Sequence, residues 1–219
     1  MLGSSFVQVG SGEALDINEA VKTTGLPGLN EDMSDFATTM MTWTGSGYRT
    51  YGFVTEEEAI ANEWPEAANK WILGDFTDIA VVPVPVGDGF WVQTTGTGTI
   101  TLIGQVPAEA TTDITINPGL NLISCPYAKD INIQDVKVNG LPGLNEAMDD
   151  FATTILVWTG SGYKTYGYVT EAEAIANEWP EAANKWILGD FTDIADVTIP
   201  AGAGFWIQTT GTGSVTFTK

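Results

Sequence analysis

The chain has 219 residues, of which 28 are acidic and eight are basic, so its formal net charge is −20. This charge repels nucleic-acid phosphates and anionic lipid surfaces, and we expect neither nucleic acid nor an inserted membrane segment. The chain contains no histidine and one cysteine, Cys125. That composition excludes Ser-His, Cys-His and His-metal catalysis, and also a disulfide within the chain.

The sequence is a duplication. A shift of 115 residues aligns residues 21–104 with 136–219 without a gap; 21 of the 84 pairs differ and 63 are identical. Glycine, threonine and valine are abundant, and short alternating segments are separated by turn residues. We therefore predict an all-β chain of two tandem homologous domains, residues 1–105 and 106–219. Each is expected to be an antiparallel β-sandwich or barrel with short helical insertions.

Taken in chain order, the first predicted element is a helical turn at residues 16–19, ending at Gly25. Residues 38–43 and 48–54 are predicted to form a hairpin around a Thr-Gly-Ser-Gly turn. A short helix should follow Thr55, because Thr55 and Glu58 have capping-box spacing, and it should stop near Pro65. Residues 89–94 and 99–103 are predicted to form a second hairpin, and the second domain repeats the series.

The two predicted domains begin differently. Residues 111–119 read as a strand and turn that precede the second domain, and they have no counterpart before Met1. Either residues upstream of Met1 were removed, or the first domain lacks an edge strand. Another molecule could then supply that strand by strand addition at the N-terminal edge of domain 1.

One segment is copied without change. Residues 62–80 are identical to residues 177–195, and across residues 54–80 the only difference is Glu57, which is replaced by Ala172. A uniform rate of change would give about seven differences there. We expect this segment to present a defined surface that packs against the equivalent region of another domain, within one chain or between chains. Local gene conversion is the alternative explanation.

Aromatic residues recur in both repeats. If Phe90 and Val92 point inward, Trp91 lies on the opposite strand face. There it could be covered by the helix of its own domain, by the other domain or a neighbouring subunit, or by a sugar ring. The candidate interface or ligand-contact residues are Trp64, Trp71, Trp91, Trp179, Trp186 and Trp206.

Acidic side chains suggest two further possibilities. Carboxylates are the ligands that calcium prefers, which makes Asp75, Asp78, Asp190 and Asp193 calcium candidates, with helix capping or surface charge as the alternative. Paired carboxylates can also hydrolyse glycosidic bonds. Asp75 with Asp78, or Glu63 with Glu66, are such pairs, with a solvated acidic loop as the alternative.

Two motifs, Trp-x-Gly-x-Gly-Tyr at residues 43–48 and 158–163 and Gly-x-Gly-Phe-Trp-[Val/Ile]-Gln at residues 87–93 and 202–208, occur in both repeats. They resemble the Trp/Gly-rich β repeats of secreted and cell-surface bacterial proteins. The resemblance implies an exported protein with a structural or adhesive role, and it brings no catalytic residues.

These observations together predict a non-enzymatic structural subunit of an extracellular surface assembly or filament. Its partner is expected to be a second copy of itself, and no cofactor is required. A carbohydrate-binding adhesin that uses exposed tryptophans is the alternative, and a carboxylate-based glycosidase is a distant third.

Overall fold

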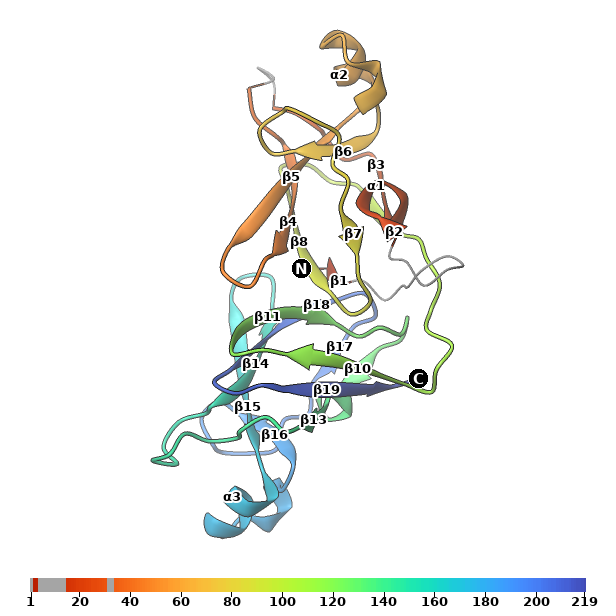
Figure 1. Ribbon diagram of the computed structural model, residues 1–219. Helices are drawn as coiled ribbons and strands as arrows, with labels where there is room; N and C mark the ends of the chain where they lie inside the picture. Colours follow the sequence, from red (N-terminus) through yellow and green to blue (C-terminus); the bar gives the residue numbers. More distant parts are fainter. Residues whose placement is uncertain (1, 4–14, 31–33) are drawn as a thin grey trace.

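The computed structural model describes residues 2–3, 15–30 and 34–219. Figure 1 shows a chain built from antiparallel sheets, and the all-β prediction is confirmed. Within the described residues the helices are short. They are α1 Ile17–Ala20, α2 Glu56–Ala61 and α3 Glu171–Ala176, with the 3₁₀ turns η1 Pro65–Ala67, η2 Ile133–Asp135 and η3 Pro180–Ala182.

In the first half of the chain a five-stranded sheet has the order β1-β8-β4-β5-β6, and two smaller pairs, β2-β7 and β3-β9, accompany it. The strands are β1 Leu2–Gly3, β2 Leu15–Asp16, β3 Val21–Thr24, β4 Thr38–Trp43, β5 Tyr48–Val54, β6 Lys70–Leu73, β7 Pro83–Val84, β8 Gly89–Thr94 and β9 Thr99–Leu102.

The second half repeats this plan. Its five-stranded sheet has the order β11-β18-β14-β15-β16, beside a β12-β17 pair and a three-stranded sheet, β10-β19-β13. The strands are β10 Thr111–Ile116, β11 Gly119–Ser124, β12 Ile131–Asn132, β13 Lys137–Asn139, β14 Thr153–Trp158, β15 Tyr163–Val169, β16 Lys185–Leu188, β17 Thr198–Ile199, β18 Gly204–Thr209 and β19 Gly213–Thr218. The predicted boundary after residue 105 falls in the connection between β9 and β10.

Local sequence explains several of these elements. Strands β4 and β5 form the predicted hairpin, with Trp43 opposite Tyr48. Helix α2 begins at the predicted capping box, in which Thr55 and Glu58 cap each other, and it ends before Pro65. Strand β10 occupies the predicted strand at residues 111–116.

The second predicted hairpin is wrong. Strand β8 pairs with β4, whereas β9 pairs with β3 in a different sheet. The glycine-rich turn between them is a corner rather than a hairpin loop, because Gly98 passes so close to β3 that a Cβ would lie 2.6 Å from the Thr24 carbonyl oxygen. The predicted extent of the first helical turn is also wrong. Asp16 is the N-cap of α1, but the helix ends at Ala20 because the residues after it pair with β9.

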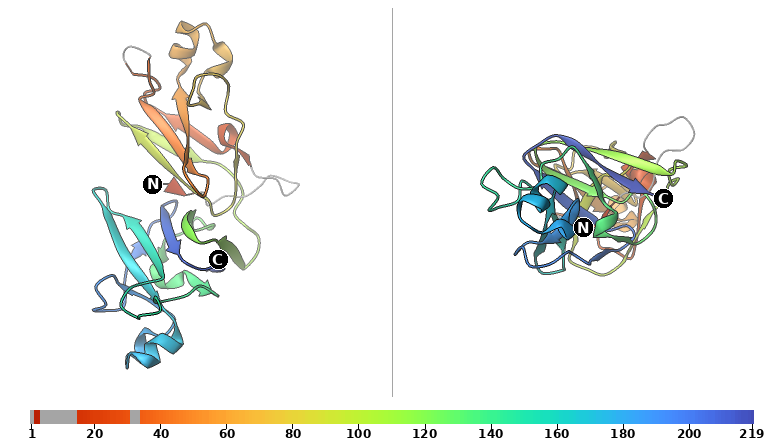
Figure 2. Two further views of the ribbon diagram at one scale, coloured as in Figure 1. Left: turned by 60° about the vertical axis from the view of Figure 1, so that its left-hand side comes forward. Right: turned by 90° about the horizontal axis from the view of Figure 1, so that it is seen from below.

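The two halves are stacked along one long axis, as Figures 1 and 2 show. Helix α2 lies at one end of the molecule and α3 at the other, while β8, β11 and β18 meet near the middle. We call this central contact the seam. No helix in the described part of the chain is long and apolar enough to cross a membrane.

Candidate functional site

Residues 54–80 and 169–195, which differ only at Glu57 and Ala172, form the two ends of the molecule (Figure 1). We call these two segments the two tips. In the first tip, the Glu58 carboxylate accepts hydrogen bonds from the N–H groups of Thr55 and Leu29, each 2.8 Å long. Glu173 makes the same two contacts in the second tip, at 2.8 and 2.9 Å. In each tip, one half-buried carboxylate therefore joins the short helix to the loop that precedes the first hairpin.

The backbone of the tips is unusual. Seven non-glycine residues in the described chain have positive φ, and six of them lie in the tips: Glu63, Asn69 and Phe76 and their counterparts Glu178, Asn184 and Phe191. L-amino acids other than Asn and Asp seldom adopt this conformation, and it persists only where the surroundings hold it. A constrained backbone gives a physical reason for the unchanged sequence.

Each tip encloses a small apolar pocket. The pocket of the first tip has a volume of about 180 Å³, and that of the second about 200 Å³. Seven lining positions are equivalent in the two pockets: Leu29, Val54, Ala59, Asn62, Trp64, Ile72 and Phe76 in the first, and Leu144, Val169, Ala174, Asn177, Trp179, Ile187 and Phe191 in the second. The predicted candidates Trp64 and Trp179 are therefore pocket walls.

An exposed apolar side chain accompanies each pocket. Ile60 is 64% exposed on α2, and Ile175 is 63% exposed on α3. Phe76 is 40% exposed and stacks on Phe36 with ring centroids 4.2 Å apart. The sequence analysis did not predict these isoleucines as contact residues. The sequence did contain a signal for them, because each is an apolar residue in a duplicated stretch with glutamates on both sides.

The prediction that Trp71 and Trp186 contact a partner or ligand is wrong. Trp71 and Trp186 are each 1% exposed in the two main cores, and their indole N–H groups donate to the Val21 and Val136 carbonyls. Their strand positions face inward, so they can touch no partner. Of the two alternatives for the duplicated segments, the structure excludes packing on each other within one chain, because the two tips lie at opposite ends (Figure 1).

Aromatic rings from both repeats meet at the seam. Trp43 lies edge to face with Trp206 at 5.3 Å, and Trp158 lies edge to face with Trp91 at 5.4 Å. Tyr48 contacts Trp206 at 6.2 Å, and Tyr163 contacts Trp91 at 6.3 Å. Trp91 could have been covered by its own helix, by the other domain or a neighbouring subunit, or by a sugar. In the structure, the other half of the chain covers it. Trp43, Trp158 and the two tyrosines were not among the predicted contact residues.

The two sides of the seam differ in polar detail. The Trp206 indole N–H donates to the Tyr163 hydroxyl at 3.1 Å. Burial, together with the nearby Tyr163, raises the Tyr48 pKa, and the Trp91 indole N–H opposes this rise. That buried N–H makes no hydrogen bond with any described residue.

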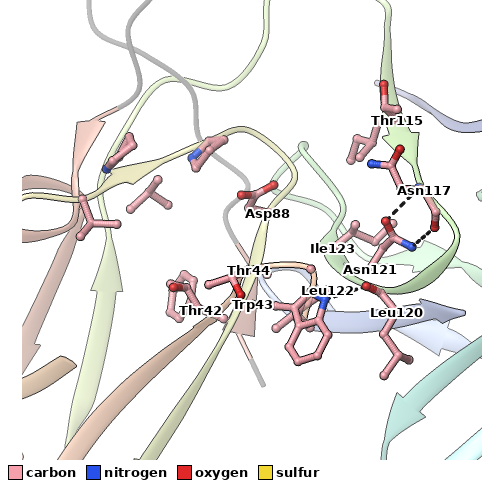
Figure 3. A pocket seen from close by; sticks show the side chains of 18 of the residues that line it. Thr42, Trp43, Thr44, Asp88, Thr115, Asn117, Leu120, Asn121, Leu122 and Ile123 are labelled. Carbon is pink, nitrogen blue, oxygen red and sulfur yellow. Dashed lines mark hydrogen bonds between the residues drawn. The ribbon is translucent and has the colours of Figure 1, made fainter. Parts of the chain in front are cut away.

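A cavity of about 410 Å³ opens beside the seam (Figure 3). The Trp43 indole N–H donates to the Leu120 carbonyl at 2.7 Å in its wall. Asp88 is the one titratable side chain among the described lining residues, and the second repeat has Ala203 in its place. Burial raises the Asp88 pKa to about 6, although the side chain keeps exposed surface toward the cavity.

The predicted acidic candidates are engaged in turns. The Asp75 carboxylate accepts hydrogen bonds from the hydroxyl and N–H of Thr77, at 2.6 and 3.2 Å, and Asp190 does the same with Thr192. These bonds lower the pKa of both aspartates, whereas a glycosidase acid needs a raised pKa. Asp193 accepts from the Ile194 N–H at 2.8 Å. No group of three metal-ligating side chains occurs in the described ranges, so the structure does not assemble Asp75 and Asp78, or Asp190 and Asp193, into a calcium cluster.

Comparison with models of protein families, with curated proteins and with solved structures found no match to this chain.

Proposed function

We propose that the protein is a structural subunit that assembles end to end through its two tips, into a filament or layer outside the cell. One observation carries the proposal: two nearly identical tips place the same pocket and the same exposed isoleucine at both ends of one rod-like molecule. A subunit with two equivalent ends forms chains. The resemblance to Trp/Gly-rich β repeats supports the extracellular location.

The contact we envisage is self-complementary. Two tips related by a two-fold axis would each place an isoleucine, Ile60 or Ile175, in the pocket of the other tip. Each pocket is lined by Trp, Phe, Val, Ile and Leu side chains and its volume of about 200 Å³ suits one branched aliphatic side chain. Because the two tips are almost identical, either tip can pair with either.

Charge opposes this contact. The first tip contains seven acidic residues and one basic residue, and the second contains six and one. Like-charged surfaces repel within about one Debye length, which is ~10 Å at 0.1 M salt. Apolar burial must therefore exceed the repulsion, and salt or divalent cations should favour assembly.

The test compares three variants by light scattering, sedimentation and negative-stain microscopy. The unmodified chain should form linear polymers, Ile60→Asp alone should stop at dimers, and Ile60→Asp combined with Ile175→Asp should give monomers. Val81→Asp is the matched control, because Val81 is 84% exposed just outside the tip and the second repeat already has Asp196 there. Monomeric unmodified chain at high concentration, or polymers of the double variant, would overturn the proposal.

Carbohydrate adhesion is the second candidate. Tyr48, Trp158 and Tyr163 remain 49%, 36% and 42% exposed around the seam, where aromatic faces are available to sugar rings. Titration of polysaccharides while following tryptophan fluorescence tests it. A saturable response that disappears in Trp158→Ala and leaves assembly unchanged supports adhesion, and no response to any glycan removes it.

A further inference from the structure

The two tips differ in one side chain. Position 57 on α2 is a glutamate, position 172 on α3 is an alanine, and both are exposed, while every other residue of 54–80 recurs in 169–195. The neighbouring loop at residues 30–35 carries three acidic residues, and so does its counterpart at residues 145–150. The charge difference between the two tips with their loops is therefore the single carboxylate of Glu57.

Glu57 lies on the same face of α2 as the exposed isoleucine. Residues three apart in a helix are neighbours on its surface, and Glu57 precedes Ile60 by three. Both side chains are exposed. The next residue, Glu58, instead turns its carboxylate toward backbone N–H groups of its own tip and of the preceding loop. A partner that covers Ile60 therefore comes close to the Glu57 carboxylate.

The fold of the tip does not need this carboxylate. Helices α2 and α3 span equivalent sets of six residues and begin with the same capping box, although Ala172 replaces Glu57. The capping contact from the Glu58 N–H to the Thr55 hydroxyl is 3.3 Å long, and its counterpart in the second tip is 3.4 Å. The exposed isoleucine one turn further on is equally accessible in both tips. Glu57 therefore changes the charge of the tip surface and leaves its shape.

We infer that Glu57 determines the order in which the tips pair, so that second tips pair with each other before first tips do. This inference rests on the tip-to-tip contact proposed above. In that contact Ile60 or Ile175 enters the pocket of an acidic partner tip, and position 57 or 172 approaches the same acidic surface. A contact between two first tips includes two Glu57 carboxylates, a mixed contact includes one, and a contact between two second tips includes none.

The order of pairing sets the architecture of the assembly. Once two second tips have paired, the dimer presents a first tip at each end, and it grows only through contacts between first tips. Such a filament alternates two kinds of contact, and its repeating unit is a pair of chains related by a two-fold axis. Because salt screens repulsion between exposed carboxylates, dimers should dominate at about 0.01 M sodium chloride and longer assemblies at about 0.15 M.

The test isolates each kind of contact by blocking the other tip. Ile60→Asp leaves only second tips free, and Ile175→Asp leaves only first tips free. Each chain should stop at dimers, whose dissociation constants are measured by sedimentation equilibrium. Contacts between exposed charges change an equilibrium by about two- to fivefold each, so the first-tip dimer should be about tenfold weaker at about 0.01 M salt. At about 0.15 M the difference should fall below about threefold.

Exchange of the one differing residue provides the matched comparison. In the Ile175→Asp chain, Glu57→Ala should tighten the dimer to the value of the Ile60→Asp chain, and Glu57→Gln should act similarly because it also removes the charge. In the Ile60→Asp chain, Ala172→Glu should weaken the dimer about tenfold. Glu109→Gln is the control, because it removes the same charge from the connection between β9 and β10, outside both tips. It should change either dimer by less than about twofold.

The results separate failure of the pairing order from failure of the contact itself. Equal dissociation constants of the two blocked chains at low salt would overturn the pairing order and leave the tip-to-tip contact in place. Equal effects of Glu57→Gln and Glu109→Gln would do the same. Absence of dimers from both blocked chains would overturn the contact, and the pairing order with it.

Discussion

Trp43 and Trp206 meet edge to face across the seam, with ring centroids 5.3 Å apart, and Trp158 and Trp91 make the equivalent contact at 5.4 Å. Residues 43 and 158 are equivalent in the two repeats, as are residues 91 and 206. The two contacts are therefore related by an approximate two-fold axis. A two-fold contact uses the same surface of both repeats. The seam therefore buries one aromatic surface of each repeat, and the tips remain at the far ends.

The seam contact should be measurable as a coupling energy. Edge-to-face aromatic pairs contribute about 0.5–1.5 kcal/mol beyond area burial. A double-mutant cycle with Trp43→Ala and Trp206→Ala, followed by urea unfolding, should give a coupling of this size. The same cycle between Trp43 and Trp186, which packs on Tyr168 in the opposite core, should give a value near zero. A coupling energy near zero in the Trp43–Trp206 cycle would contradict the contact between these two rings across the seam.

Glu58 should stabilise the first tip through its two accepted hydrogen bonds. Glu58→Gln turns one accepting oxygen into a donor and leaves an N–H unpaired, which should cost about 1–3 kcal/mol. The measurement is the free energy of unfolding, together with faster amide exchange at Leu29. Glu57→Gln is the control, because Glu57 is exposed and alanine replaces it in the second repeat. Equal effects of the two substitutions would contradict the assigned role of the Glu58 carboxylate.

Asp88 should make stability depend on pH in a known direction. Its pKa is raised to about 6 in the folded chain, above the usual value of an aspartate, so the folded state holds more protons between pH 4 and 6 than the unfolded state. Stability from this group therefore falls as pH rises through that window and stays low above it. Asp88→Asn should gain thermal stability over the unmodified chain as pH rises from 4 to 7. A difference that is constant with pH would contradict the raised pKa.

Assembly through acidic tips should respond to salt. Raising the ionic strength from about 0.01 M to 0.15 M shortens the Debye length from about 30 Å to about 8 Å, which weakens repulsion between tips but leaves apolar burial in place. The scattering-average mass should therefore rise with sodium chloride, and the Ile60→Asp, Ile175→Asp double variant should remain monomeric throughout. Polymers that dissociate as salt is added would indicate a contact dominated by opposite charges.

The sequence by itself determined the elements whose causes are local. The capping-box spacing of Thr55 and Glu58 located the start of α2, and the glycine turn after Trp43 located the β4–β5 hairpin. The 115-residue shift showed the duplication. These features need only near neighbours or comparison of one repeat with the other.

Only the tertiary structure decided which surfaces are free. Strand alternation could not tell whether Trp71 faces a core or a partner, because either side of a strand can be covered by a second layer; the structure buries it completely. It could not show that Trp91 is covered by Trp158, or that β8 and β9 belong to different sheets. These outcomes depend on contacts between residues far apart in the chain, whose geometry is fixed only when the whole fold packs.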